Sequence, residues 1–309
     1  MRHRTPRHPL PLRHRLVVPH MRQNQGDRTM SSFIPGAYDG IRNADYHADP
    51  ALGSTSLKTL AKPGGQAKFK AAQERPQEHK TAFDLGTAAH SLILEGDLTG
   101  LAIIDAENYL TKAAKEARNA AYAEDKTPLL PHEFAAVQAM QDAVMNHPLA
   151  AKAFTGHTPE RSIFWEHETG RMLKCRPDAL RPGLIVDLKT ANTAEPNEWG
   201  RDAGKFRYHQ QAAHYIDGIK AVTGETLPFA FVVVEKEYPH LVSWIEFDPN
   251  MLDEDGRDDI DRGRALNALA LARLAESERT GLWPGYPTSS RISLPPWLAR
   301  QEQSQLEDS

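Results

Sequence analysis

Two aspartates and one lysine in the second half of the chain have the types and the spacing of a metal-dependent site. Asp178 follows Pro177, and Asp187 and Lys189 stand two residues apart in the run Leu184-Ile-Val-Asp-Leu-Lys189. Side chains alternate across a strand, so Asp187 and Lys189 point to one face, while Asp178 reaches the same place across a hairpin. Two carboxylates suit Mg²⁺, and an adjacent lysine can activate a water for phosphodiester hydrolysis. An ordinary ion pair on a strand is the competing interpretation.

His90, in a predicted helix, is a further candidate for this site. Gly86 and His90 lie at i and i+4 in Leu85-Gly-Thr-Ala-Ala-His90, which places both on one helix face. A glycine lets the helix approach another backbone closely, and a histidine one turn later can reach a metal held by the sheet. The alternative is a hydrogen-bonded polar histidine without a chemical role.

A helical stripe further along the chain supplies amide and phenol groups. Tyr208, Gln211, Tyr215 and Ile219 share one face of a predicted helix, with Gln211 and Tyr215 at i and i+4. The choice between Gln210 and Gln211 depends on the helix phase, and Tyr208 competes with Tyr215 as the site tyrosine. Core packing with a surface hydrogen bond is the alternative for this whole stripe.

Basic and aromatic side chains near these residues could contact a polyanion. The basic ones are Lys174, Arg176, Lys205 and Arg207. Lys174, Arg176 and Asp178 lie at i, i+2 and i+4 of one predicted strand and so share a face. This arrangement would set two cations beside a metal where phosphates pass. Charge balance for the acidic residues explains the two cations equally well. Trp165 and Trp199 could stack on a base, although core packing explains them better.

The elements that position these groups follow from hydrophobic periodicity and turn residues. Residues 33–80 read as loop and helix, with an N-cap at Ser54 or Ser56, and further helices are expected over 81–95 (ended by Gly96), 106–124, 132–146, 195–223 and 249–279. Strands are expected over 162–166, 171–175 and 184–189 as an antiparallel meander, and over 228–236 and 241–247 as a pair. This order predicts an α/β fold, a central mixed sheet flanked by helices.

Composition places the chain among globular proteins and divides it into three parts. The 309 residues are 40% hydrophobic and 25% charged, which suits one elaborated domain. The first 29 residues hold seven arginines and one acid, and the remainder carries a balance of −10. We expect a disordered basic arm over 1–29, which could be an artefact of start-site choice, a catalytic domain over 30–282 and a loose Pro- and Ser-rich tail over 283–309.

Cysteine content and hydropathy exclude several classes of protein. The single cysteine, Cys175, excludes a disulfide scaffold and four-cysteine zinc or iron–sulfur sites, and it suits a cytoplasmic location. No stretch approaches the ~18 apolar residues of a membrane span. An acidic body does not attract nucleic acid by bulk charge, so any such site must be a local basic lining.

Four short motifs occur in an order known from one nuclease superfamily. They are Gly-x-x-x-His at 86–90, Pro-Asp at 177–178, Asp-x-Lys at 187–189 and Gln-x-x-x-Tyr at 211–215. On a helix, two strands and a helix, they resemble the RecB-type branch of the PD-(D/E)xK nuclease superfamily. The segments around these motifs are similar to those of the phage-type exonuclease VIII family, and the resemblance covers roughly residues 33–280.

The resemblance implies a PD-(D/E)xK nuclease-like fold and a Mg²⁺-dependent exodeoxyribonuclease, with Mn²⁺ as a substitute. Such an enzyme degrades one strand of linear double-stranded DNA from its end, 5′ to 3′, for phage-type recombination, with a single-strand annealing recombinase as partner. By matching position, the resemblance implies metal ligands at His90, Asp178 and Asp187, a water-activating Lys189, and catalytic or DNA-contacting roles for Gln211 and Tyr215.

Two alternatives stay open at this point. A related RecB-like nuclease of other polarity, or with an endonuclease role, would carry the same motifs. A catalytically inactive DNA-end-binding protein would keep the fold, although the intact Asp178, Asp187 and Lys189 argue against it. We also expect a closed homo-trimer or homo-tetramer, in contact through the 249–279 helix or the 106–146 helices, because a ring retains DNA despite an acidic body.

Overall fold

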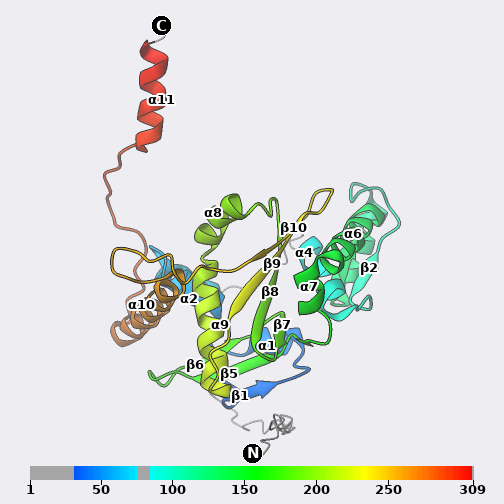
Figure 1. The fold of residues 1–309 in the computed structure, drawn as a ribbon, viewed down its shortest axis with the longest axis horizontal. Coiled ribbons are helices and arrows are strands. Elements are labelled where there is room, and N and C mark those ends of the chain that lie inside the picture. Colours follow the sequence, from blue (N-terminus) through cyan, green and yellow to red (C-terminus); the bar gives the residue numbers. More distant parts are fainter. Residues whose placement is uncertain (1–30, 75–83, 308–309) are drawn as a thin grey trace, which may run out of the picture.

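The computed structural model describes residues 31–74 and 84–307 (Figure 1). The basic arm predicted over 1–29 lies outside the described residues, as do residues 81–83 of the predicted 81–95 helix. None of the helices in the described ranges combines the length and the apolar content of a membrane span.

A mixed five-stranded sheet is the centre of the fold, with the strand order β10-β9-β8-β7-β4. β8 (Leu184–Ala191) and β9 (Phe229–Glu235) run parallel, and the other neighbours are antiparallel. The remaining strands are β4 (Thr158–Pro159), β7 (Ala179–Arg181) and β10 (Val242–Ile245). Two helices between β8 and β9 form the crossover that a parallel pair requires. The predicted α/β fold with a central mixed sheet is confirmed.

Two smaller sheets accompany the central one. β1 (Gly36–Tyr38), β5 (Ser162–Glu166) and β6 (Met172–Cys175) form an antiparallel sheet in the order β1-β5-β6. β2 (Leu101–Ile103) and β3 (Thr127–Leu129) form a parallel pair. β5 and β6 pair as predicted, but the expected three-stranded meander is wrong, because β8 belongs to the central sheet. The chain crosses between the sheets just before β7, whose three residues are too few to show a hydrophobic period.

Helices cover both faces of the central sheet (Figure 1). One face carries α4 (Asp84–His90), which continues as a π-helical turn (Ser91–Glu95), together with α6 (Pro131–Asn146). The other face carries α9 (Tyr208–Thr223), against which α10 (Asp259–Thr280) packs. The remaining helices are α1 (Asn43–Ala48), α2 (Ser54–Leu60), α3 (Gly65–Glu74), α5 (Lys112–Ala123), α7 (Pro148–Ala153), α8 (Pro196–Phe206) and α11 (Pro296–Glu307).

Alternation along β8 divides the core into two halves. Ile185 packs in the cluster that includes α9 and α10, whereas Val186 and Leu188 pack in the cluster that includes α4 and α6. Apolar burial on both faces, at about 25 cal/mol per Å², holds the strand rigidly in place. Asp187 and Lys189 share the face of Ile185, as the alternation predicts, and α9 covers that face.

The helix expected over 195–223 is interrupted in the structure. Arg207 has φ 56° and ψ 51°, in the left-handed region, and there α8 ends and α9 begins. The expected helix over 81–95 ends at Gly96 as predicted, with φ 64°. The helix end at Gly96 can be predicted from the sequence because glycine readily adopts this conformation. An arginine rarely adopts it, so the sequence gives no signal for the helix end at Arg207.

Three other expected segments have different limits. The closing helix begins at Asp259, capped by Asp258, and not at 249. The expected 106–124 helix begins at Lys112, after the N-cap Thr111. The tail expected to be loose contains α11, because its last residues are strong helix formers, although every described residue after Trp297 except Leu298 is exposed.

The entry segment contains more structure than expected. The helix expected after residue 54 is α2, whose N-cap is Gly53, and neither Ser54 nor Ser56 holds that position. Two further elements, β1 and α1, precede α2, and α3 follows it. The sequence gives no clear signal for these three elements. The expected core role of the two tryptophans is the one found, because Trp165 and Trp199 are 5% and 1% exposed.

Gly263 marks the closest approach of α10 to α9, and its replacement tests this packing. A Cβ at Gly263 would lie 2.5 Å from the carbonyl oxygen of His209, so we expect Gly263→Ala to lower the free energy of unfolding by about 1–3 kcal/mol. Gly204 in the exposed part of α8 has open space around it, so Gly204→Ala should raise that free energy by up to about 1 kcal/mol. Denaturant unfolding measures both, and effects of the same sign would contradict the packing.

Candidate active site

The Asp187 and Lys189 side chains lie side by side on β8. The Lys189 ammonium forms an ion pair with Oδ2 of Asp187, and Gln211 on α9 donates a hydrogen bond to Oδ1 at 2.7 Å. Asp187 is 1% exposed, so these partners replace water at both of its oxygens. Burial opposes the charge on Lys189, but Asp187 and Asp178 more than offset it and raise the pKa of the ammonium. Lys189 is therefore a half-buried, protonated donor.

Asp178 meets this pair across the β7–β8 hairpin. Its Oδ2 accepts a hydrogen bond from the backbone N–H of Leu188 at 2.6 Å, which holds the carboxylate next to the strand that carries Asp187. Burial, and then the charge of Asp187, raise the pKa of Asp178 well above its usual range, although Lys189 acts in the opposite direction. Asp178 thus lacks a full counter-charge within the described part of the chain.

His90 approaches Asp178 from the last residue of α4. Its Nδ1 lies 3.6 Å from Oδ2 of Asp178. Gly86 lets the helix come close to β8, because a Cβ there would lie 3.4 Å from Oγ1 of Thr190. Burial lowers the pKa of His90, and Lys189 adds to the effect, so the imidazole is neutral at pH near 7 and keeps a lone pair for a metal.

Glu160 joins this group, although the sequence analysis did not select it. It lies between β4 and β5, with a left-handed φ of 50°, and its carboxylate lies 3.5 Å from the Arg176 guanidinium. Burial, and then Asp178, raise the pKa of Glu160 to about 7. The sequence offers only a carboxylate just before a predicted strand, which is too common to be a signal.

The donor atoms of these residues fit a hard divalent cation. Single donor atoms of His90, Glu160 and Asp178 all lie within 4.8 Å of one another. Two carboxylates and one neutral imidazole are ligands that Mg²⁺ and Mn²⁺ accept, and the raised pKa values of both acids mark a local deficit of positive charge. Asp187, expected as a ligand by resemblance, is not one of the three; Lys189 and Gln211 engage its oxygens in this structure, and its role as a ligand stays a prediction.

The structure gives the two glutamines different partners, and it places both tyrosines that the sequence left open at the cavity. Gln211 faces Asp187, whereas Gln210 donates to Oδ1 of Asn267 on α10 at 3.0 Å. Tyr215 is 9% exposed and lines the cavity beside the site, and burial, followed by the charge of Asp187, raises its pKa. Tyr208 also lines the cavity, with the Lys189 ammonium 5.1 Å from its ring centroid.

The basic residues expected to contact phosphates differ in their hydrogen-bond partners and in their exposure. Lys174 donates to the Asp49 carbonyl at 2.7 Å, and Arg176 donates to Oγ of Ser162 at 2.9 Å and packs 4.0 Å from the ring centroid of Tyr46. Both donors attach the N-terminal segment to the sheets, and Arg176 also pairs with Glu160, so charge balance, the alternative left open by the sequence, describes Arg176 better than a free phosphate contact. Lys205 is exposed and lines the cavity.

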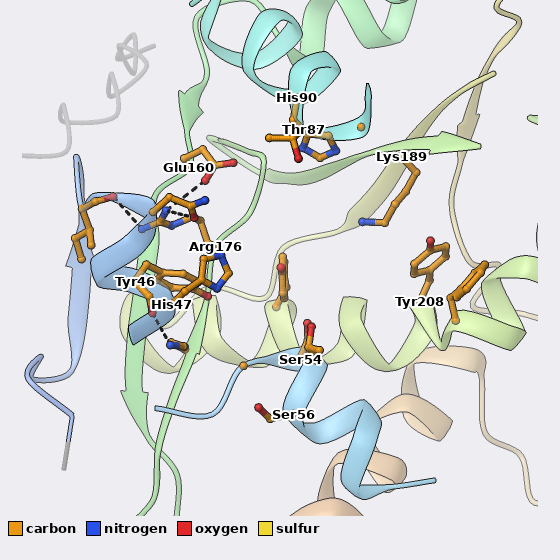
Figure 2. Close-up of a pocket in the computed structure, with 18 of the residues that line it drawn as sticks. Tyr46, His47, Ser54, Ser56, Thr87, His90, Glu160, Arg176, Lys189 and Tyr208 are labelled. Carbon is orange, nitrogen blue, oxygen red and sulfur yellow. Dashed lines mark hydrogen bonds and ion pairs between the residues drawn. The ribbon is translucent and has the colours of Figure 1, made fainter. Parts of the chain in front are cut away.

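One large cavity is lined by several of these groups, among them His90, Glu160, Lys189, Tyr208 and Tyr215. It has a volume of about 1680 Å³, and Figure 2 shows His90, Glu160 and Lys189 reaching it from different elements. Its walls come from the segment around α1 and α2 on one side and from α4, β8 and α9 on the other. The cavity therefore gives a ligand access to Glu160, His90 and Lys189.

Comparisons with known proteins place this fold and site in a family. Residues 53–264 match the PDDEXK-like domain of unknown function DUF3799, so the chain belongs to that family and has a PD-(D/E)xK nuclease-like fold. A protein from Eubacterium rectale, provisionally described as an exonuclease, shares the fold with a TM-score of 0.58 and 16% identity, over 84% of this chain and 96% of that one.

More distant comparisons add little. The solved structure of SSO0001 superposes with a TM-score of only 0.27 and 14% identity, over 65% of this chain and 88% of that one. No protein with a curated description matches the sequence. The membership of the superfamily thus agrees with the sequence analysis, while the finer likeness to exonuclease VIII stays a prediction.

The two aspartates should respond oppositely to neutralisation. The folded-state pKa of Asp178 lies above its unfolded value, so its protonated form stabilises the fold at low pH and this contribution is lost as the pH rises. With EDTA present, we expect the parent to lose stability as the pH rises above the ordinary carboxyl range, with Glu160, whose pKa is raised to about 7, contributing to the loss, and Asp178→Asn to lose less. Asp187→Asn should instead destabilise, because it leaves Lys189 half-buried without its carboxylate. Denaturant unfolding measures this, and a steeper decline for Asp178→Asn would count against the site.

Metal binding tests the assignment of Glu160. We expect Glu160→Gln to weaken Mn²⁺ binding, measured by calorimetry without DNA, by about 10-fold or more, because a ligand loses its charge. Glu95→Gln removes the same charge from the wall of the same cavity and should change the affinity by no more than about twofold. Equal losses in the two variants would show a general charge effect and would remove Glu160 from the ligand set.

Proposed function

We propose that this protein is a Mg²⁺-dependent exodeoxyribonuclease that degrades one strand of linear double-stranded DNA from its end, 5′ to 3′. The observation that carries the proposal is the Asp187–Lys189 pair next to Asp178 and His90, at the wall of a cavity. A structural ion pair alone does not account for two further acids with raised pKa values beside it.

Each residue has a role in this proposal. His90, Glu160 and Asp178 would hold the metal, with Asp187 contributing when its partners release an oxygen. A metal held there would polarise a phosphate and lower the pKa of a bound water. Lys189 orients that water and offsets the negative charge that develops during attack, and Gln211 keeps Asp187 in place. Tyr215 lines the wall of the cavity and positions the DNA strand.

The substrate and partners belong to the same proposal. The fold shared with the Eubacterium rectale protein and the volume of the cavity support a DNA substrate. We infer a cytoplasmic role in phage-type recombination, with a single-strand annealing recombinase as partner and a homo-trimeric or homo-tetrameric ring. α10 buries its apolar face on α9, so the 106–146 region, with Leu110 and Met145 exposed, is the better contact of the two expected.

Three other functions predict different outcomes. An inactive DNA-end-binding protein would leave both DNA forms intact. The close approach of the Asp178, Asp187 and Lys189 side chains argues against this function. An endonuclease of the same superfamily would nick circular DNA. An exonuclease of the opposite polarity would shorten the same linear duplex from its 3′ end.

Incubation of linear and circular duplexes, with and without Mg²⁺, distinguishes these functions. We expect the protein to degrade the linear form alone, only with Mg²⁺, and to release nucleotides from the 5′-labelled end. Lys189→Ala should slow the turnover by about 100-fold while Mn²⁺ still binds, because the lysine acts on the water and the charge. Lys220→Ala, an exposed lysine at the far end of α9, is the matched control and should keep the parent rate. Nicking of the circle, or intact linear DNA, would overturn the exonuclease proposal.

A further inference from the structure

Three aromatic rings stand in a row at the edge of the cavity, beside Lys189. Tyr208 stacks on Trp199, with ring centroids 5.4 Å apart and an interplanar angle of 20°. Phe206 lies next to Tyr208, at 5.8 Å and 32°. Trp199 is 1% exposed and Phe206 is 45% exposed, so the row runs from the core to the surface. All three residues line the cavity, and Figure 2 shows Tyr208 near Lys189.

The backbone at Arg207 creates this row. Residues at i and i+2 on a continuous helix do not face each other, so Phe206 and Tyr208 could not be neighbours within one helix. The left-handed conformation of Arg207, which non-glycine residues rarely adopt, ends α8 and starts α9 between them. Such strained conformations cluster at binding sites, where the surrounding structure maintains them.

Three lysines surround the rings. The ammonium of Lys189 lies 5.1 Å from the Tyr208 ring centroid, and that of Lys58 lies 5.6 Å from it. The ammonium of Lys205 lies 5.2 Å from the Phe206 ring centroid. These ammonium groups lie over the rings, and aromatic rings together with cations suit a ligand that combines a flat π-system with negative charge, which is the chemistry of a nucleotide. An apolar peptide would gain nothing from the three cations.

We propose that Phe206 and Tyr208 form a stacking subsite for an unpaired nucleobase of the strand that is cut. The inference rests on the proposed function and deepens it. The base stacks on the exposed face of Phe206, Lys205 meets the adjoining phosphate, and Lys189 connects this subsite to Asp187. Trp165 and Trp199, the stacking candidates of the sequence, are buried and offer no free face.

The subsite is tested with DNA that carries 2-aminopurine at single positions of an unpaired end, with Ca²⁺ in place of Mg²⁺ so that bound DNA is not cut. We expect the parent to quench the fluorescence at one position. Phe206→Ala should abolish this quenching and weaken binding by about 5- to 100-fold, the scale of one stacked base. Phe206→Tyr keeps a ring and should retain both signals. Trp297→Ala removes another exposed aromatic ring, on α11, and should behave as the parent.

The outcomes separate this inference from the proposed function. If the parent binds and degrades linear DNA but Phe206→Ala quenches and binds like the parent, the subsite is refuted and the nuclease assignment stands. If the parent neither binds nor degrades DNA, both fail. An equal loss in Phe206→Ala and Phe206→Tyr would also refute stacking, because tyrosine preserves the aromatic face.

Discussion

The crowding of the carboxylates of Asp178, Asp187 and Glu160, with only Lys189 and Arg176 as cations paired to them among the residues that the structure describes, is the constraint on which the site depends. Buried charges are costly unless they are paired, and Lys189 can fully compensate only Asp187. Asp178 and Glu160 are left with raised pKa values, and a neutral His90 stands beside them. A divalent cation supplies the missing charge, so the same imbalance that weakens the metal-free fold favours metal binding.

The fold can hold this unfavourable group because its supports are conventional and rigid. β8 lies between two apolar clusters, and the β7–β8 hairpin fixes Asp178 through the backbone of Leu188. Helix α4 reaches the strand at Gly86 and carries His90 with it. The charged group and the left-handed backbone of Glu160 and Arg207 make folding less favourable. Core packing on both faces of the sheet offsets this cost.

Charge is distributed in a way that the overall composition hides. The body outside the first 29 residues is acidic, yet Lys189 and Lys205 line one wall of the cavity beside aromatic rings, and Lys58 lies over the Tyr208 ring. Lys174 and Arg176 are close in sequence to the aspartates, but internal carbonyl and hydroxyl groups occupy their donors. Proximity to a motif is therefore a poor guide to which cations remain available for a polyanion.

The sequence by itself determined the α/β fold, the alternation that places Asp187 and Lys189 on one face, and the helix that carries His90. These features depend on local periodicity, glycine stops and short spacings, which adjacent residues encode. Only the tertiary structure decided that Glu160 joins Asp178, that Gln211 and not Gln210 faces Asp187, and that Arg207 breaks a helix to align Phe206 with Tyr208. Those outcomes depend on helix phase and on contacts between distant segments, which no local pattern specifies.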